Sequence, residues 1–258
     1  IMKKLIGALA SLPLLAACVS VNTTTQTRVQ EAEALPLPPV TIYHLEGRRS
    51  ERIVWLMEEL GYPYELEYVP GDLQASMNLV RALGHEMPQV PTVVIGDQIL
   101  VESGAIMETI LTRYAPGELA PPIDSEFYPT YLMWLHYAEG SLAARLFSDY
   151  RAWRTNPPTS RSPLVDSEAV VQYAENWLED YDYFGGPEFS AADIIMWFPL
   201  NVATQLNLVD VNQFPQVAAW KERVEARPAY QRMVATARPN GVPGNLTPVQ
   251  VRPPSQRN

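Results

Sequence analysis

The sequence predicts an α/β domain followed by an all-α domain. Strand-like and helix-like periodicities alternate between residues 40 and 118, and only helical periodicity follows between residues 119 and 237. Apolar residues make up 47% of the 258 residues, which is typical of a globular protein that buries its own core. Small folds that depend on disulfides or metal ions are therefore excluded.

Charge and cysteine content exclude further classes. The chain carries 19 basic and 29 acidic side chains, and both domains share the acidic excess. We therefore expect no cationic surface of the kind that binds a nucleic acid. The single cysteine, Cys18, permits neither an intrachain disulfide nor a C-x-x-C redox pair. The three histidines lie far apart without the spacing of metal ligands, so we expect no metal site.

Residues 1–17 have the layout of a signal peptide. Two lysines precede an apolar run, Leu5 to Leu14, that is too short to span a bilayer. The run leads into Leu15-Ala16-Ala17-Cys18, which resembles the bacterial lipobox, whose cysteine is acylated. This resemblance implies a lipoprotein anchored to a bacterial membrane through Cys18 and facing the periplasm, and Val19 after the cysteine favours the outer membrane. The alternative is a secretory segment with an incidental cysteine.

Two other segments lack sustained periodicity. Residues 18–39 are polar and then interrupted by prolines, which predicts a flexible tether behind the lipidated cysteine. Residues 238–258 contain five prolines and two glycines, which predicts a disordered tail.

The first domain, residues 40–118, alternates strands and helices. The run from Val40 to Leu45 is β-branched and aromatic, and Ser50 then precedes apolar residues at helical spacing that end at Gly61. We next expect a strand over 64–69, a helix over 75–83, strands over 92–95 and 99–101 around a Gly-Asp hairpin, and a helix over 104–114. This βαβαββα order, with an early parallel pair and a late hairpin, is the thioredoxin-like pattern.

The second domain, residues 119–237, shows helical signals only. Helices are expected over 128–150, 167–181, 191–207 and 215–227, with a last short one near Tyr230. Ser190 and Asp193 have the spacing of a capping box, in which each side chain accepts a hydrogen bond from the other residue's backbone amide. We interpret this pair as structural.

Four short motifs in a fixed order point to a family. The chain carries Gln89-Val90-Pro91, then Glu102-Ser103-Gly104-Ala105-Ile106, then Phe189 to Ile194, and finally Trp220 with Arg227 to Tyr230. Over residues 40–237 it resembles the cytosolic-type glutathione transferases, and Arg49 to Leu56 is similar to the S-R-S-x-R-x-x-W-L opening of bacterial and fungal members. The resemblance implies a thioredoxin-like domain followed by an α-helical C-terminal domain, glutathione as co-substrate, and a homodimer.

The resemblance also implies a glutathione site. A cis peptide bond before Pro91 would turn the backbone of Val90 toward the cysteinyl part of glutathione, whereas the alternative is an ordinary trans proline. Ser103, at a helix N-terminus, suits the γ-glutamyl carboxylate, and Glu102 suits the γ-glutamyl ammonium. Gln89, which stands where many relatives have lysine, would donate to the glycyl carboxylate. Without a ligand, Ser103 would simply begin a helix.

The expected chemistry depends on forming the glutathione thiolate, which is the nucleophile. Arg48 occupies the position where the resemblance implies a hydroxyl. Three alternatives stay open: Arg48 or Arg49 stabilises the thiolate as a cation, Ser50 donates to it, or Ser50 only caps the first helix. A cysteine nucleophile is excluded because Cys18 lies in the predicted anchor.

The second substrate is expected to be a small apolar electrophile. Aromatic residues on the first helix of the second domain, above all Trp134 and Tyr137, would line its pocket, unless they are core residues. The sequence therefore predicts an enzyme that attacks an apolar electrophile with the glutathione thiolate. The alternatives are a non-catalytic ligand-binding or scaffold lipoprotein of the same fold, or a glutathione-dependent etherase or isomerase.

Overall fold

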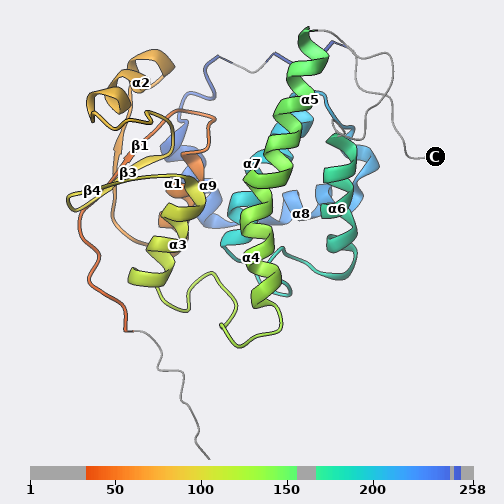
Figure 1. The fold of residues 1–258 in the computed structure, drawn as a ribbon, viewed down its shortest axis with the longest axis horizontal. Helices are drawn as coiled ribbons and strands as arrows, with labels where there is room; N and C mark the ends of the chain where they lie inside the picture. The colour runs from red at the N-terminus through yellow and green to blue at the C-terminus, as the bar shows by residue number, and fades with distance from the viewer. Residues whose placement is uncertain (1–32, 156–166, 245–246, 251–258) are drawn as a thin grey trace, which may run out of the picture. The chain divides into compact units, whose positions relative to one another are not determined.

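The computed structural model describes residues 33–155, 167–244 and 247–250 (Figure 1). The predicted fold class is confirmed, with a four-stranded α/β domain followed by a helical domain. The predicted signal peptide and Cys18 lie outside the described residues.

The sheet has the strand order β2-β1-β3-β4. Strand β1 pairs in parallel with β2 and antiparallel with β3, and β3 pairs antiparallel with β4, as the predicted early crossover and late hairpin require. Alternate residues of β1 are buried, and Ile42 has no exposed surface, because one face of the strand packs on the core. The strands are Val40–Tyr43, Glu65–Glu67, Thr92–Ile95 and Gln98–Val101.

Three helices accompany the sheet. They are α1 (Glu51–Leu60), α2 (Leu73–Ala82) and α3 (Ser103–Tyr114). Helix α1 ends at Gly61, whose φ of 65° is left-handed and therefore suits glycine. Helices α1 and α3 contact each other and also contact α7 (Ala191–Gln205) of the helical domain, so the sheet domain meets the helical domain through them.

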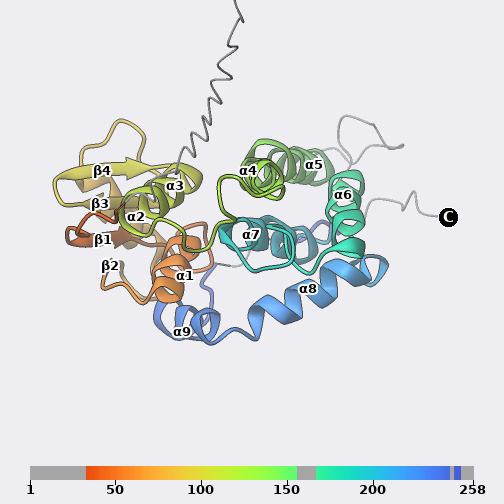
Figure 2. The same ribbon diagram turned by 90° about the horizontal axis from the view of Figure 1, so that it is seen from below.

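The helical domain is built around α7. Its helices are α4 (Tyr128–Tyr137), α5 (Ala144–Thr155), α6 (Ser167–Asp180), α7 (Ala191–Gln205), α8 (Pro215–Glu225) and α9 (Pro228–Ala237). Nearly every side chain of α7 is buried, as expected for a helix that is apolar all round. Figure 2 shows α7 between the α4–α5 layer and α8, and α9 beside α1.

Ser190 and Asp193 form the capping box at the start of α7. The Asp193 carboxylate accepts hydrogen bonds from the Ser190 amide at 2.9 Å, the Phe184 amide at 2.9 Å and the Trp220 indole at 2.8 Å. Burial raises the pKa of Asp193 to about 6, although these donors oppose the shift. The box therefore also joins α7 to the loop before it and to α8.

The helix expected over 128–150 is interrupted. A π-helical segment, η1 (Ala138–Ala143), separates α4 from α5. Such widened turns bring an extra residue into the helix and often occur at functional sites. Here the segment includes Glu139, which lies at the candidate site described below.

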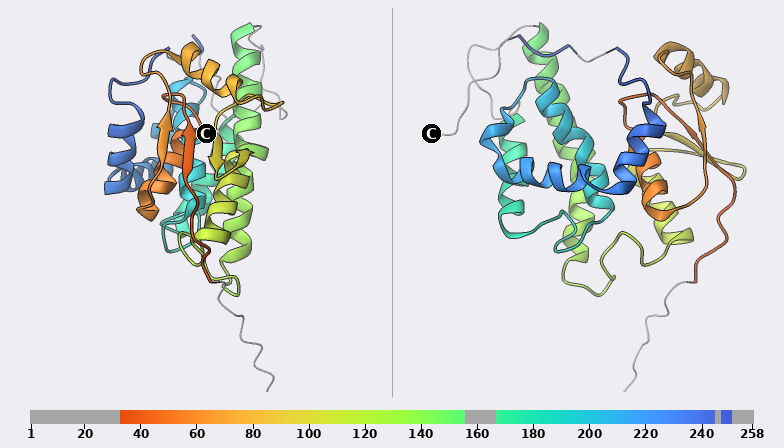
Figure 3. Two further views of the ribbon diagram at one scale, coloured as in Figure 1. Left: turned by 90° about the vertical axis from the view of Figure 1, so that its left-hand side faces the viewer. Right: turned by 180° about the vertical axis from the view of Figure 1, so that it is seen from behind.

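The disordered tail predicted for residues 238–258 is wrong for the part that the structure describes. Val249 is buried, its amide donates to the Leu206 carbonyl at 3.0 Å, and its carbonyl accepts from Asn207. Tyr150 of α5 donates to the Thr247 carbonyl, so the chain beyond α9 crosses toward α5 (Figure 3). Long-range contacts hold this segment, and such contacts leave no local periodicity in the sequence.

Candidate functional site

The residues predicted to bind glutathione converge on one cavity of about 340 Å³. They come from the loop before β3 and from the junction of β4 with α3. Two further residues complete the wall, Arg49 from the β1–α1 loop and Glu139 from η1. The lining residues are Arg49, Gln89, Val90, Pro91, Glu102, Ser103 and Glu139. Segments that are distant in sequence thus form a single polar pocket.

Backbone conformation shapes this cavity at two points. The Val90–Pro91 peptide bond is cis, as the resemblance implied. Glu102 has a φ of 71°, a conformation that is costly for a residue with a side chain and that is often found at functional sites. The Gln89 side-chain nitrogen donates to Glu102 Oε1 at 2.8 Å, so the two polar residues hold each other at the rim.

A buried arginine organises the floor of the cavity. Arg52 is 1% exposed, and its Nη1 donates to Ser103 Oγ at 3.0 Å and to Glu139 Oε1. Burial lowers the pKa of Arg52 to about 10, while Glu139 opposes that shift. Because Ser103 Oγ accepts from a group that can only donate, its own hydrogen is left to donate to a ligand.

Glu139 pairs with two arginines. Its Oε1 accepts from Arg49 Nε at 2.8 Å as well as from Arg52. Burial alone would raise the pKa of Glu139, but the charges and hydrogen bonds of Arg52 and Arg49 outweigh burial and lower it. The Arg49 guanidinium also lies 5.2 Å from the ring centre of Phe198, so its position at the cavity is fixed from two sides.

The structure places Ser50 away from this cavity. Ser50 is the N-cap residue of α1, as predicted, but its side chain makes no capping hydrogen bond. Ser50 is fully buried, and its hydroxyl lies 2.8 Å from His44 Nδ1. The other ring nitrogen of His44, Nε2, lies 2.6 Å from the Ala237 carbonyl, an acceptor. Nε2 must therefore carry the hydrogen of a neutral His44. The Ser50 hydroxyl then donates to Nδ1 at 2.8 Å, which is nearer than its other acceptor, the Leu45 carbonyl at 3.3 Å.

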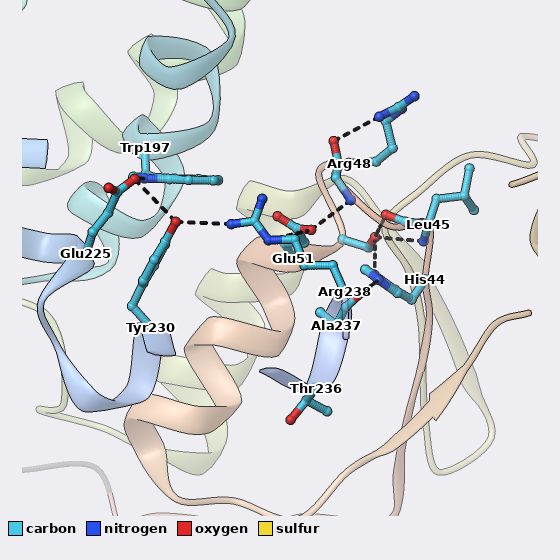
Figure 4. Close-up of polar contacts among 12 residues, drawn as sticks. His44, Leu45, Arg48, Glu51, Trp197, Glu225, Tyr230, Thr236, Ala237 and Arg238 are labelled. Carbon is cyan, nitrogen blue, oxygen red and sulfur yellow. Dashed lines mark hydrogen bonds and ion pairs between the residues drawn. The ribbon is translucent and has the colours of Figure 1, made fainter. Parts of the chain in front are cut away.

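The two residues predicted to activate the thiol, Ser50 and Arg48, thus do not line the cavity of the predicted glutathione site. Burial lowers the pKa of His44 to about 4, so the histidine stays neutral and keeps accepting from Ser50. Arg48, labelled in Figure 4, lines a different cavity. Its guanidinium donates to the carbonyls of Gly47 and Gly244. Arg49 is the cation that lies at the predicted glutathione site.

Trp134 and Tyr137 belong to the core of the helical domain. Trp134 has no exposed surface and packs among Tyr137, Tyr173, Trp177 and Phe184 at ring distances of 4.8 to 6.0 Å. Tyr137 is half-buried and donates to the Val170 carbonyl at 3.1 Å. Neither lines the two cavities described here, so the alternative of core residues is the better interpretation.

Sequence reasoning missed Arg52 and Glu139 as site residues. Arg52 could have been found from its position, since a charged residue lies there among the buried apolar positions of α1. Glu139 had no comparable signal, because its role depends on the π-helical turn.

Across the described residues, no cluster of three or more histidine, aspartate or glutamate side chains could hold a metal ion. In the same part of the chain, every helix is too short or too polar to cross a membrane.

Comparisons with known proteins agree with this geometry. Residues 38–112 match the family model described as glutathione S-transferase, N-terminal domain, and residues 164–228 match the one described as glutathione S-transferase, C-terminal domain. Glutathione S-transferase 3 of Schizosaccharomyces pombe is 28% identical over 209 residues, which are 74% of this chain and 84% of that protein. Glutathione S-transferase 1 of Saccharomyces cerevisiae is 22% identical and is covered over 99% of its length, against 80% of this chain.

A solved structure shows the same fold. The crystal structure of a glutathione S-transferase from Actinobacillus pleuropneumoniae has a TM-score of 0.68 and 25% identity to this chain, and covers 79% of this chain and 94% of its own. Both domains match in order, and two motifs of the first domain, Gln89-Val90-Pro91 and Glu102-Ser103, line the cavity. The chain belongs to the glutathione S-transferase family.

Proposed function

We propose that this protein binds reduced glutathione and uses its thiolate to attack an apolar electrophile. The observation that carries the proposal is the convergence of Gln89, Val90, Pro91, Glu102 and Ser103 on one cavity. These residues come from two segments that the sequence separates, and the family to which the chain belongs takes its name from the use of glutathione.

The γ-glutamyl end of glutathione carries both a carboxylate and an ammonium group. Ser103 suits the carboxylate, because its hydroxyl hydrogen is not used by Arg52 and its amide lies at the N-terminus of α3. Glu102 suits the ammonium, and the hydrogen bond from Gln89 fixes its carboxylate in place. This bond changes the role expected for Gln89, which acts first on Glu102 and keeps one amide hydrogen for the ligand.

Arg49 is our candidate for stabilising the thiolate. A fixed positive charge at the cavity favours the charged form of a bound thiol and so lowers its pKa. Its ion pair with Glu139 and its position over Phe198 would hold the Arg49 guanidinium in place before glutathione binds. The thiolate sulfur would form a bond to the electrophilic carbon. In a substitution the leaving group departs with the electron pair of its broken bond, and in an addition to a polarised double bond the resulting anion takes a proton from water.

A second candidate function is binding without turnover. It is favoured by one observation, since Ser50 is buried against His44 and Arg48 faces another cavity. Of the seven described lining residues, Ser103 carries the only hydroxyl, and it is used for the γ-glutamyl end in our proposal. Without an activated thiol, the protein would hold glutathione or a hydrophobic partner as a scaffold.

Calorimetric titration of reduced glutathione tests the site. We would use the full chain with Cys18→Ser, which prevents acylation there, and compare Ser103→Ala and Glu102→Gln with the exposed control Glu65→Gln. Loss of a hydrogen bond to a charged group costs about 1.5–3 kcal/mol, so each site variant should bind at least about tenfold more weakly. Unchanged affinity in both variants would refute the assignment.

An electrophile screen then separates the two candidate functions. Enzymatic transfer predicts a rate above that of free glutathione, and Arg49→Gln should lower it. Saturable binding with no such rate for any electrophile would favour the scaffold.

We also propose a membrane-anchored homodimer, since the lipobox-like segment around Cys18 and the family resemblance both support it. Recovery of the wild type in the membrane fraction and a dimer mass in sedimentation are the expected results.

A further inference from the structure

The cavity of the predicted glutathione site is electrically balanced before a ligand binds. Among its seven lining residues, Arg49 carries a positive charge, whereas Glu102 and Glu139 carry negative charges. Arg52 adds a second positive charge from behind, because its Nη1 donates to both Ser103 Oγ and Glu139 Oε1. Reduced glutathione brings one ammonium group and two carboxylates into this balance, and its thiolate would add a further negative charge.

Both cations of the cavity are already engaged. Arg49 Nε donates to Glu139 Oε1 at 2.8 Å, and the guanidinium lies 5.2 Å from the Phe198 ring centre. In the proposed function this guanidinium faces the glutathione sulfur. Arg52 is 1% exposed, so it acts on a ligand only through Ser103, which serves the γ-glutamyl carboxylate. Neither arginine is therefore left for the second carboxylate of glutathione, that of its glycyl end.

The glycyl end would lie beside a segment that contains no lysine or arginine. With the γ-glutamyl end at Ser103 and the cysteinyl part at Val90, the order of glutathione leaves its glycyl end at residues 84–89, which precede Val90. The one acid of this segment is the exposed Glu86. His85 is engaged within the segment, since its Nδ1 lies 3.1 Å from the backbone amide two residues later. An anionic glycyl end thus meets no fixed opposite charge in these six residues.

The remaining arginines of the first domain lie elsewhere. Residues 40–118 contain five arginines and no lysine, and two of the five are described above. Arg48 lines the different cavity, and Arg81 donates to Asn78, one turn earlier on α2. Arg113, in the last turn of α3, lies over the ring of the next residue at 5.5 Å. None of the three is placed at the glycyl end.

Gln89 supplies a neutral donor at this end instead. Its side-chain nitrogen carries two hydrogens, and one of them is donated to Glu102 Oε1 at 2.8 Å. The second hydrogen suits the oxygen of an amide as well as that of a carboxylate. A hydrogen bond with one charged partner gains far less from that charge than an ion pair does, so Gln89 discriminates weakly between the two.

We propose that the cavity recognises the glycyl end through Gln89 as a carbonyl group and not as a charge. Its substrates then include γ-glutamyl-cysteinyl thiols whose third residue ends in a neutral amide. Such a thiol brings one negative charge to the balanced cavity, that of the thiolate facing Arg49, whereas glutathione brings a second one without a partner. This inference rests on the proposed function for the γ-glutamyl and cysteinyl parts of the ligand.

Three thiols titrated by calorimetry into the full chain carrying Cys18→Ser test the proposal. They are reduced glutathione, its glycinamide analogue, and cysteinylglycine, which lacks the γ-glutamyl group. The glycinamide should bind as tightly as glutathione, within about threefold, or more tightly, because no cation is lost. Binding of the glycinamide more than about threefold weaker than that of glutathione would overturn the proposal. Cysteinylglycine should bind at least about tenfold more weakly than either.

A variant that introduces a cation locates the glycyl end. Gln89→Lys should give glutathione an advantage of at least about tenfold over the glycinamide, because only glutathione offers a carboxylate to the new charge. Gln98→Lys makes the same change at an exposed position of β4 that does not line the cavity, and should give no such advantage. The ratio of the two affinities within one variant cancels any loss common to both ligands. An unchanged ratio in Gln89→Lys would refute the placement of the glycyl end.

The outcomes separate this inference from the proposed function. Binding of glutathione with no binding of the glycinamide would refute the inference alone. Binding of the glycinamide without glutathione would support the inference and refute glutathione as the co-substrate. Binding of neither, or equal binding of cysteinylglycine and glutathione, would refute the γ-glutamyl assignment and the inference with it.

Discussion

His44 should make the fold sensitive to acid. The neutral ring donates from Nε2 to the Ala237 carbonyl and accepts at Nδ1 from Ser50, and it thereby connects β1, α1 and the end of α9. Burial lowers the pKa of His44 to about 4; the Ala237 carbonyl opposes this shift and the Arg238 charge adds to it. An unfolded histidine titrates near 6.5, so as the pH falls from about 6.5 to about 4 the unfolded chain takes up a proton that the folded chain refuses.

The magnitude follows from this difference in pKa. The shift from 6.5 to about 4, at about 1.4 kcal/mol per pKa unit, corresponds to about 3 kcal/mol of unfolding free energy lost by pH 4. Above pH 6.5 both states are neutral, and the loss disappears. Other groups titrate over the same range, so the contribution of His44 must be isolated with a variant.

Urea unfolding at several pH values between 7 and 4.5 measures it. His44→Gln should lose less stability on acidification than the wild type, whereas His136→Gln, at an exposed histidine, should follow the wild type. If the His44→Gln and wild-type stabilities fell in parallel, the buried neutral histidine would be refuted, and with it the commitment of the Ser50 proton.

Three further predictions concern the cap, the thiol and the anchor. Asp193→Ala leaves buried donors on Phe184, Ser190 and Trp220 without an acceptor and should cost about 3 kcal/mol or more in urea unfolding, whereas the exposed control Asp182→Ala should cost about 1 kcal/mol or less. Arg49→Gln should raise the pKa of bound glutathione, read from thiolate ultraviolet absorbance against pH, and an unshifted titration would exclude the cation. Cys18→Ser should move the protein from the membrane fraction to the soluble fraction; retention in the membrane would refute the anchor.

The features predictable from the sequence are those with local signals. A hydroxyl three residues before an acid marks the start of α7, and β-branched alternation marks β1 and β3, because capping and pleating depend on neighbouring residues. A local signal of the same kind gave the wrong partner for the Ser50 hydroxyl. A serine before an apolar helix resembles a cap, but its hydroxyl bonds to His44, which is fixed in turn by Ala237 from the far end of the chain.

The parts that could not be predicted depend on contacts between distant segments. The role of Glu139 depends on a π-helical turn that brings it to Arg49 and Arg52. The chain beyond α9 is rich in proline and glycine, yet Val249 is buried there and its amide donates to the Leu206 carbonyl. Helical spacing indicates that Trp134 is buried, but it does not say whether the ring meets a ligand or other rings.

A crystal structure of the protein grown with reduced glutathione tests the central assignment most directly. We expect glutathione in the cavity lined by Gln89, Val90, Pro91, Glu102 and Ser103, with its γ-glutamyl carboxylate on Ser103 and its sulfur toward Arg49. Glutathione bound elsewhere, or this cavity empty at a glutathione concentration that saturates calorimetric binding, would contradict the assignment.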